Sequence, residues 1–276
     1  MHTDEQVVAH YSRPGLEQAI LDALTRSGHA DLDHLAPAQL SGADEFHLGW
    51  RPATVAFATA LGFPRGAHVL DIGAGIGGPA RHFAEGHGVR VTGIDLSSDY
   101  VEAANALTRR CGLTDFADFE TADALGLPFE AGSFDGAYTI HAAMNISEKG
   151  TLFAEARRVL KPGARFGVYD IMRVDDGEIP YPMPWAATVE TSFVETVDTY
   201  RDLLAAAGFA IESQTDRGDL ARDLGRRMRE KAAADGPPPL GLHTVMGPAT
   251  PERLGNVMKT LEARTIAPIE IIARAV

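Results

Sequence analysis

The chain is poor in cysteine and in basic side chains. Cys111 is its only cysteine, so no internal disulfide can form and a zinc site built from cysteine ligands is excluded. We therefore predict no metal site, and we expect a protein of the reducing cytoplasm. Lys and Arg number 25 against 38 Asp and Glu, which gives a formal net charge of -13. Proteins that bind nucleic acid need a basic face, so we predict no nucleic-acid partner.

Long apolar runs are also missing. The longest, "PATVAFATALGF" at 52–63, is shorter than the ~18 residues that a membrane-spanning helix needs. The first residues, "MHTDEQVVAHY", are polar and acidic and lack the apolar core of a secretory signal peptide. We therefore expect a cytoplasmic protein without a membrane partner.

From residue 68 onwards the chain alternates short strand-like segments with helical ones. The strand-like segments are rich in Val, Ile, Tyr and Phe, and two are almost continuously apolar, as strands buried on both faces are. They lie at 68–72, 90–96, 118–122, 134–140, 164–171, 209–215 and 269–276. This alternation predicts an α/β fold with a mostly parallel sheet built from βαβ units.

Two regions depart from the alternation. Residues 1–65 contain only helical patterns, at 4–11, 15–28 and 51–63, and they predict a helical lid or cover. Before the last strand, two further helical patterns are joined by a Pro- and Gly-rich connector. We therefore predict two parts, a cover at 1–65 and a main domain at 66–276 with a helical insertion at 217–266.

The stretch "VLDIGAGIGGPARHF" at 69–83 is a glycine-rich turn between a strand and a helix. Such a turn lets the backbone approach a ligand, and the helix N-terminus favours negative groups. Gly73, Gly75 and Gly78 spell the G-x-G-x-x-G pattern of dinucleotide sites. Asp95, at the end of the next strand, can accept hydrogen bonds from the hydroxyls of a ribose. At this point NAD and any other adenosine-bearing cofactor fit equally well.

Three features favour a cofactor other than NAD. Asp71 precedes the glycines, where a buried carboxylate repels a pyrophosphate but can hold an ammonium group. Asp123, in "TADALGLPF", is placed to accept from an adenine amino group, with Ala124 beside the ring. The chain also shows no second mononucleotide-binding half, which a dinucleotide needs.

Five motifs, in order and spacing, resemble those of class I S-adenosylmethionine-dependent methyltransferases. They are "VLDIGAGIGG", "GIDLS", "ADALGLPF", "SFDGAYTIHAAMNI" and "RVLKPGARF". More narrowly, the chain resembles the bacterial small-molecule branch, which includes the sarcosine/dimethylglycine and quinone methyltransferases. The resemblance implies a Rossmann-like, seven-stranded sheet of order 3214576 with its last strand antiparallel, and S-adenosyl-L-methionine as cofactor. The main domain would then be the methyltransferase domain.

Carried onto this sequence, the resemblance implies roles for eight cofactor-binding residues. They are Asp71, Gly73, Gly75, Asp95, Leu96, Asp123, Ala124 and His141. The two glycines would pass beneath the methionine part, which Asp71 would face. Asp95 would bind the ribose hydroxyls, Leu96 would lie against the adenine, and Asp123 with Ala124 would flank its amino edge. His141 would lie close to the sulfonium and is also the candidate base, or the residue that orients a water or packs on the cofactor.

Five residues are candidates for contact with the methyl acceptor: Tyr11, Trp50, Asn145, Trp185 and His243. Tyr11 resembles an N-terminal tyrosine that closes over the cofactor in relatives. Trp50 replaces the second glycine of a segment that often reads H-x-G-G in relatives, here "FHLGWRPAT". Core packing for Tyr11 and Trp185, and a surface position for His243, are the alternatives.

The sequence therefore predicts methyl transfer to the O, N or C atom of a small molecule with apolar surface, in secondary metabolism such as antibiotic biosynthesis. One alternative is a catalyst that retains the cofactor without methylating, such as a cyclase or pericyclase. Another is an NAD-dependent oxidoreductase, which depends on the G-x-G-x-x-G pattern alone. A homo-oligomer remains open, because the N-terminal helices can cover their own pocket or that of a neighbouring subunit.

Overall fold

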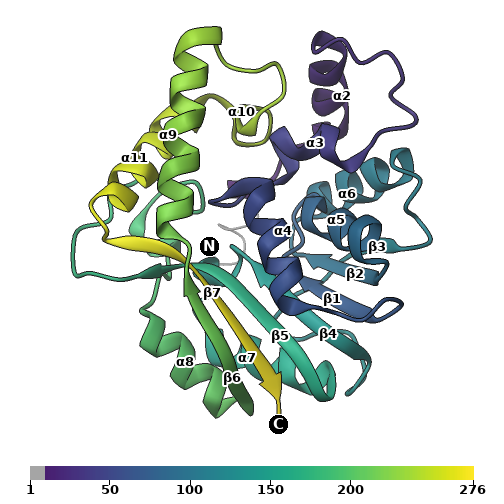
Figure 1. Cartoon of the computed structure of the whole chain (residues 1–276), viewed down its shortest axis with the longest axis vertical. Coiled ribbons are helices and arrows are strands. Elements are labelled where there is room, and N and C mark those ends of the chain that lie inside the picture. Colours follow the sequence, from purple (N-terminus) through teal and green to yellow (C-terminus); the bar gives the residue numbers. More distant parts are fainter. Residues whose placement is uncertain (1–9) are drawn as a thin grey trace.

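A single seven-stranded sheet forms the centre of the molecule (Figure 1), in a computed structural model that describes residues 10–276. Its strands are β1 (His68–Ile72), β2 (Arg90–Asp95), β3 (Ala117–Thr121), β4 (Phe134–Ile140), β5 (Leu160–Arg173), β6 (Phe209–Asp216) and β7 (Ile266–Ala275). The order across the sheet is β3-β2-β1-β4-β5-β7-β6, and β7 runs antiparallel to both of its neighbours. The predicted strand order and direction are confirmed.

Helices cover both faces of the sheet. On one face, α7 (Lys149–Val159) and α8 (Val197–Ala206) pack through Phe153 and Leu204 onto apolar side chains of β4, β5 and β7. On the other face, α4 (Trp50–Leu61), α5 (Gly78–His87) and α6 (Ser98–Arg110) bring Phe57, Phe83 and Val101 against β1, β2 and β4. The inner strands β1, β4, β5 and β7 are therefore mostly buried on both sides, whereas the outer strands β3 and β6 are partly exposed.

The remaining helices lie above the carboxyl ends of the strands in two groups (Figure 1). The first group, α2 (Leu16–Arg26) and α3 (Pro37–Asp44), packs against α6 and α10. The second consists of α9 (Gly218–Asp235), α10 (Leu242–Met246) and α11 (Thr250–Glu262), which leave the sheet after β6 and return to it at β7. Short 3-10 turns are η1 (Ala143–Asn145), η2 (Val189–Thr191) and η3 (Gly247–Ala249).

Two details differ from the sequence prediction. Residues 37–44 form a helix that the periodicity did not predict, and part of the expected Pro- and Gly-rich connector forms α10. Of the helix predicted at 4–11, only residues 10 and 11 belong to the described chain, and both are helical. No helix of the described part is long and apolar enough to cross a bilayer.

Candidate active site

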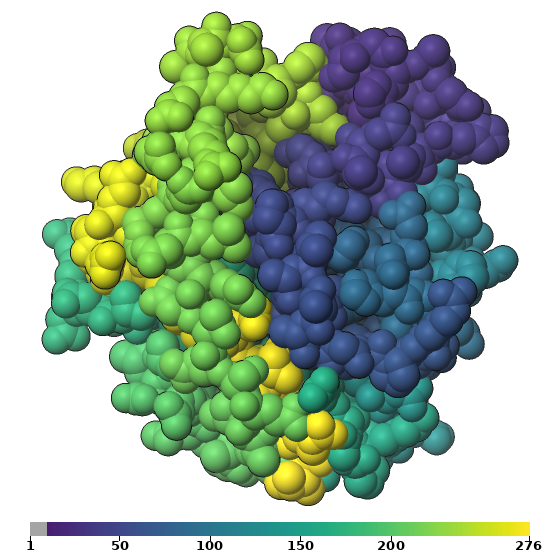
Figure 2. Space-filling model, viewed as in Figure 1, coloured from purple at the N-terminus to yellow at the C-terminus, as the bar shows by residue number. Residues whose placement is uncertain are grey.

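A large pocket opens at the carboxyl ends of β1, β2 and β4, below the two helical groups. It encloses about 1690 Å³, open space at its mouth included. The face in Figure 2 is hollowed between the N-terminal helices and the α9–α10 region. Open α/β sheets bind their ligands at this edge, so the position matches the cofactor site predicted from the glycine-rich turn.

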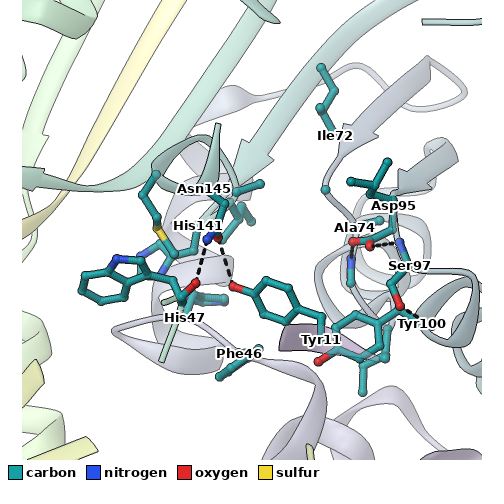
Figure 3. Close-up of a pocket in the computed structure, with 18 of the residues that line it drawn as sticks. Tyr11, Phe46, His47, Ile72, Ala74, Asp95, Ser97, Tyr100, His141 and Asn145 are labelled. Carbon is teal, nitrogen blue, oxygen red and sulfur yellow. Dashed lines mark hydrogen bonds between the residues drawn. The ribbon is translucent and has the colours of Figure 1, made fainter. Parts of the chain in front are cut away.

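The glycine-rich turn forms one wall of the pocket. Gly75 has a φ of +55°, and a Cβ built on it would meet nothing within 4 Å, so its backbone faces open space. Its amide donates to Asp95 Oδ2 at 2.9 Å, while the Ser97 amide donates to Asp95 Oδ1 at 2.9 Å (Figure 3). The two bonds fix the carboxylate beside the turn. An adenosine-bearing ligand thus finds a carboxylate acceptor next to a backbone that it can approach closely.

Gly78 serves a different purpose from Gly75. A Cβ on Gly78 would lie 2.2 Å from the carbonyl oxygen of Asp44, at the end of α3. Gly78 does not line the pocket; it lets α5 touch α3, where Arg81 donates to Asp44 Oδ2 at 2.8 Å. The G-x-G-x-x-G spelling therefore includes a packing glycine.

Asp71 lies at the bottom of the pocket. It is 2% exposed, and the Tyr138 hydroxyl donates to its Oδ2 at 3.0 Å. Burial raises the pKa of Asp71 to about 8, since the bond from Tyr138 only partly offsets the loss of water. A cationic group bound here would favour the ionised carboxylate. The fit is therefore to an ammonium group and not to a phosphate.

The other predicted cofactor residues also line this pocket. Leu96 follows Asp95 at the end of β2, and Ala124 follows Asp123 after β3. Asp123 is exposed, and its Oδ1 accepts from the Leu125 amide at 2.8 Å. This arrangement sets an apolar surface beside an exposed carboxylate that can accept a hydrogen bond. Such a surface suits a flat ring with a polar edge.

His141 follows the last residue of β4 and lies between the turn and the upper half of the pocket. Its φ of 50° is in the left-handed region, which side chains other than glycine rarely adopt. The ring stacks on Tyr169 at 5.3 Å between centroids and meets the ring of His47 edge-on at 5.7 Å. Burial, together with the charge of His47, lowers the pKa of His141 well below its ordinary value. His141 is therefore uncharged at neutral pH and can accept a proton or a hydrogen bond.

The segment at residues 10–13, which we call the strap, crosses the pocket. The Tyr11 hydroxyl donates to Asn145 Oδ1 at 3.0 Å, and the Tyr11 ring meets Phe46 and Tyr100 edge-on (Figure 3). His10 Nε2 lies 2.9 Å from the carbonyl oxygen of Pro184. The Ser12 hydroxyl and Arg13 amide both donate to Asp99, and Arg13 also donates to the carbonyl of Val245. The strap thus joins four separate walls of the pocket.

Apolar side chains line the upper half of the pocket, which we call the acceptor chamber. Its walls include Met144, Trp185, Leu242, Val245, Leu254 and Val257. Trp185 is 3% exposed, its indole donates to Ser192 Oγ at 2.9 Å, and its carbonyl accepts from Asn145 Nδ2 at 2.7 Å. Trp185 and Asn145 are therefore fixed by each other as well as facing the pocket.

Trp50 also lines the chamber. It follows Gly49, and both residues have positive φ values, 93° for Gly49 and 45° for Trp50. The backbone at Trp50 thus has a conformation that glycine adopts without strain, in agreement with the second glycine of the H-x-G-G segment. Its indole nitrogen is buried and has no hydrogen-bond partner among the described residues.

His243 is not among the residues that line the pocket. Its side chain is exposed, while Leu242 and Val245 on the same short helix are buried and point into the chamber. The apolar spacing of three residues fixes which face of α10 turns inward, and His243 falls on the other face. The position of His243 therefore agrees with the alternative, a surface histidine, and not with contact to the methyl acceptor.

Three polar residues at or behind the pocket wall were missed by the sequence reasoning: Glu45, His47 and Thr54. His47 lines the pocket, and its Nε2 lies 2.9 Å from both Glu45 Oε2 and Thr54 Oγ1. Glu45 is fully buried, which is rare for a carboxylate without a specific partner. The only available signal was the H-x-G-G resemblance, which starts at His47.

Five side chains with carboxyl groups line the pocket. They are Asp44, Asp71, Asp95, Asp123 and Glu148, and no Lys or Arg is among the lining residues of the described chain. A pyrophosphate would meet these carboxylates without a cationic partner, which is electrostatically unfavourable. A cofactor with a sulfonium and an ammonium group fits the same wall.

A family profile described as "Methyltransferase domain" matches residues 70–168, which contain the turn, Asp95 and His141. The O-methyltransferase rstn1 of Aspergillus nomiae is 33% identical over 160 residues, which are 57% of this chain and 70% of that protein. The chain belongs to the S-adenosylmethionine-dependent methyltransferases. The predicted family and cofactor are confirmed, and the nicotinamide alternative is set aside.

Two solved structures resemble this methyltransferase over nearly its whole length. The [4+2]-cyclase SpnF has 25% identity and a TM-score of 0.67, covering 94% of this chain and 92% of its own. A geranyl diphosphate C-methyltransferase from Streptomyces coelicolor, solved with S-adenosyl-L-homocysteine, has 16% identity and a TM-score of 0.69, covering 100% and 99%. In contrast, the chain spans only 64%, 30% and 55% of three curated relatives that it matches.

Proposed function

We propose that this methyltransferase transfers the methyl group of S-adenosylmethionine to a hydroxyl oxygen of a small, uncharged and largely apolar secondary metabolite. The observation that carries this proposal is the junction at His141. There, an acidic half that suits a cationic cofactor meets an apolar chamber, and one uncharged imidazole lies between them. The O-methyltransferase named among the relatives supports oxygen as the acceptor atom.

In this proposal the cofactor is held by the residues around the turn. Gly75 leaves room for its methionine part, and Gly73, whose φ is +78°, lets the turn pass close to Ala142. Asp71 pairs with its ammonium group. Asp95 accepts from the ribose hydroxyls, while Leu96, Asp123 and Ala124 flank the adenine. When bound, the cofactor supplies a methyl group on a positively charged sulfur. The neutral thioether that remains after transfer is a good leaving group.

His141 acts on the acceptor and not on the cofactor. Its uncharged ring accepts the proton of the acceptor hydroxyl, so that the oxygen gains electron density as the new O–CH₃ bond forms. Tyr11 and Trp185 close the chamber around this point and exclude water, and they orient the acceptor for an in-line reaction. Positioning and a single proton acceptor are sufficient for this chemistry.

The charge of the chamber supports an uncharged acceptor. A phosphorylated or carboxylated acceptor would need a Lys or Arg, and neither lines the pocket within the described chain. Burying an unpaired anion among Trp185, Leu254 and Val257 would cost several kcal/mol. We therefore expect neutral phenols and enols to be the preferred class.

The test is a matched panel of acceptors with isotopically labelled cofactor. Each neutral aromatic phenol is paired with its carboxylated and phosphorylated analogues, and methyl transfer is followed by mass spectrometry. The proposal expects the label in the neutral member of each pair. His141→Ala is expected to lower turnover by about 100-fold or more while S-adenosylhomocysteine affinity changes by less than about threefold. Equal turnover in His141→Ala contradicts the role of His141, and preference for the anionic analogues contradicts the acceptor class.

A second candidate, cyclisation without methyl transfer, is favoured by the likeness to the [4+2]-cyclase. The two activities differ in the mass of the product, because a cyclase yields an isomer of its substrate and a methyltransferase adds one methyl group. Incubation of the protein with a linear polyene and the same labelled cofactor therefore separates them. An unlabelled isomer that forms only with the protein would favour cyclisation.

A further inference from the structure

A buried group of three side chains lies directly behind His141, between α3 and α4. His47 Nε2 is 2.9 Å from Glu45 Oε2 and 2.9 Å from Thr54 Oγ1. The Thr54 hydroxyl also donates to Glu45 Oε2, at 2.5 Å. Glu45 and Thr54 are fully buried and His47 is 6% exposed. Each of the three side chains thus has a hydrogen-bond partner within the group, while Glu45 Oε1 is buried without one among the described residues. Of the three, only His47 reaches the pocket.

Glu45 is held in its ionised form despite its burial. Burial alone opposes ionisation, but hydrogen bonds from His47 and Thr54 and the charges of His47 and Arg51 hold the pKa of Glu45 below its ordinary value. Arg51 is the more distant partner, at 3.9 Å from Glu45 Oε1. His82 on α5 is a further titratable group near Glu45. The carboxylate therefore faces His47 as a buried negative charge.

His141 is restrained by groups from several elements. Tyr169 of β5 lies under its ring, and the Tyr169 hydroxyl donates to the carbonyl of Leu48 at 2.7 Å, which ties this strand to the segment that carries His47. The His47 ring meets both His141 and Tyr169 edge-on, at 5.7 and 5.8 Å. On the chamber side, Asn145 and Tyr11 bond to each other. The charge facing the His141 ring from behind is that of His47.

We propose that Glu45, His47 and Thr54 form a positioning triad that fixes the His141 imidazole in place to accept the proton of the acceptor. Glu45 and Thr54 orient His47 through hydrogen bonds, and the His47 ring in turn supports the His141 ring edge-on. After burial, the charge of His47 is the second cause that lowers the pKa of His141. The triad rests on the proposed role of His141 and acts through it, without contact with the reacting atoms.

The first test follows the histidine rings directly by NMR and needs no acceptor. Protein with ¹³C- and ¹⁵N-labelled histidine is titrated with pH while saturated with S-adenosylhomocysteine, and His141→Phe assigns the His141 signal. His47→Phe keeps a flat ring at the same edge but removes its charge. We expect the His141 midpoint to rise by about one pH unit. The control His82→Phe removes another histidine near Glu45 and is expected to leave the midpoint unchanged.

A second variant keeps the test decisive if His47→Phe folds poorly. Glu45→Gln retains the shape of the side chain and removes its charge, so the chemical shifts of the His47 ring are expected to differ from those of the unaltered protein. An unchanged His47 signal in this variant, or an unchanged His141 midpoint in His47→Phe, overturns the triad.

Activity then separates the triad from the proposed function. With the best acceptor of the panel, His47→Phe is expected to lower kcat by about tenfold or more, to move the acid limb of the pH profile upward, and to change KM by less than about threefold. If His141→Ala keeps full turnover, the role of His141 fails. If His141→Ala is inactive but His47→Phe has unaltered kcat and pH profile, only the triad fails.

Discussion

The cofactor half of the pocket is built from residues that are close in the sequence, whereas the acceptor half is assembled from segments that lie far apart. Asp71, Gly73 and Gly75 belong to one turn, and Asp95 follows on the adjacent strand. The acceptor chamber draws Tyr11 from the strap, Trp50 from α4 and further side chains from the loop after β5 and from α10 and α11. The first half is held by strands and backbone bonds, and the second by side-chain contacts between helices.

This difference predicts that the two halves can be disabled independently, and the largest effect is expected at Asp95. Asp95→Ala removes the carboxylate that accepts from Gly75 and Ser97 and that the ribose would use. Because hydrogen bonds to charged groups contribute about 1.5–3 kcal/mol each, S-adenosylhomocysteine affinity should fall by about 100-fold, measured by calorimetry. Asp123→Ala, at the exposed edge, is the matched control, with a loss below about tenfold. Equal losses in the two variants would show that Asp95 has no special place in the site.

The second prediction concerns pH and again touches only the cofactor half. Burial raises the pKa of Asp71 to about 8, so the empty pocket holds it protonated at neutral pH. Pairing with an ammonium group requires the carboxylate, so binding releases a proton. S-adenosylhomocysteine affinity should therefore rise with pH up to about 8, by as much as about tenfold per unit.

Calorimetry in buffers of different ionisation enthalpy measures that proton release. Asp71→Asn cannot release a proton and should bind more weakly, with a flat pH dependence between 6 and 8. A flat profile for the unaltered protein would mean that Asp71 does not change its protonation on binding.

The third prediction concerns the acceptor half alone. Leu254→Trp replaces an aliphatic side chain at the chamber wall by a bulky indole. It should raise acceptor KM by about tenfold and leave S-adenosylhomocysteine affinity within about twofold. Both tryptophans of the chain, Trp50 and Trp185, line the pocket, so fluorescence reports binding. The exposed substitution Val189→Trp controls for the added fluorophore. A matching loss of cofactor affinity in Leu254→Trp would contradict the independence of the halves.

The smallest effect is expected at the strap. Asp99 accepts from the Ser12 hydroxyl at 2.7 Å and from the Arg13 amide at 2.8 Å, and the contacts are partly exposed. Asp99→Ala should speed the release of S-adenosylhomocysteine by about two- to fivefold, followed by stopped-flow fluorescence, because the strap opens more often. Glu102→Ala, on the same helix and exposed, serves as the control. Slower release in Asp99→Ala would show that the strap does not limit exit.

The contrast between local and long-range assembly also explains which parts of the structure the sequence predicts. The strands β1 and β4 begin and end where their apolar patterns do, because a strand buried on both faces needs a run of mostly apolar residues. The sequence pattern predicts that the last strand begins at residue 269. In the structure β7 begins at Ile266, since the long strand β5 pairs Ile171 with Pro268 and Arg173 with Ile266.

Tertiary contacts decide the parts that the sequence did not predict. The helix α3 has little amphipathic pattern, and it is held in place by Arg81 bonding to Asp44 and by the close approach at Gly78. His47 and Thr54 are seven residues apart, and their common partner Glu45 becomes visible only when the chain between α3 and α4 turns back on itself. No local pattern distinguishes such a group from three ordinary polar residues.

The helices α9, α10 and α11 leave the sheet after Asp216 and return at Ile266, and the flanking strands lie side by side, with Asp216 opposite Ile269. The insertion therefore departs and rejoins at adjacent points of one strand pair, distant from the strands that carry Asp71 and Asp95. For protein engineering this is a natural cassette boundary. The part of the chamber wall that α10 and α11 supply can be exchanged between homologues through two neighbouring splice points, with the residues around the glycine-rich turn left as they are.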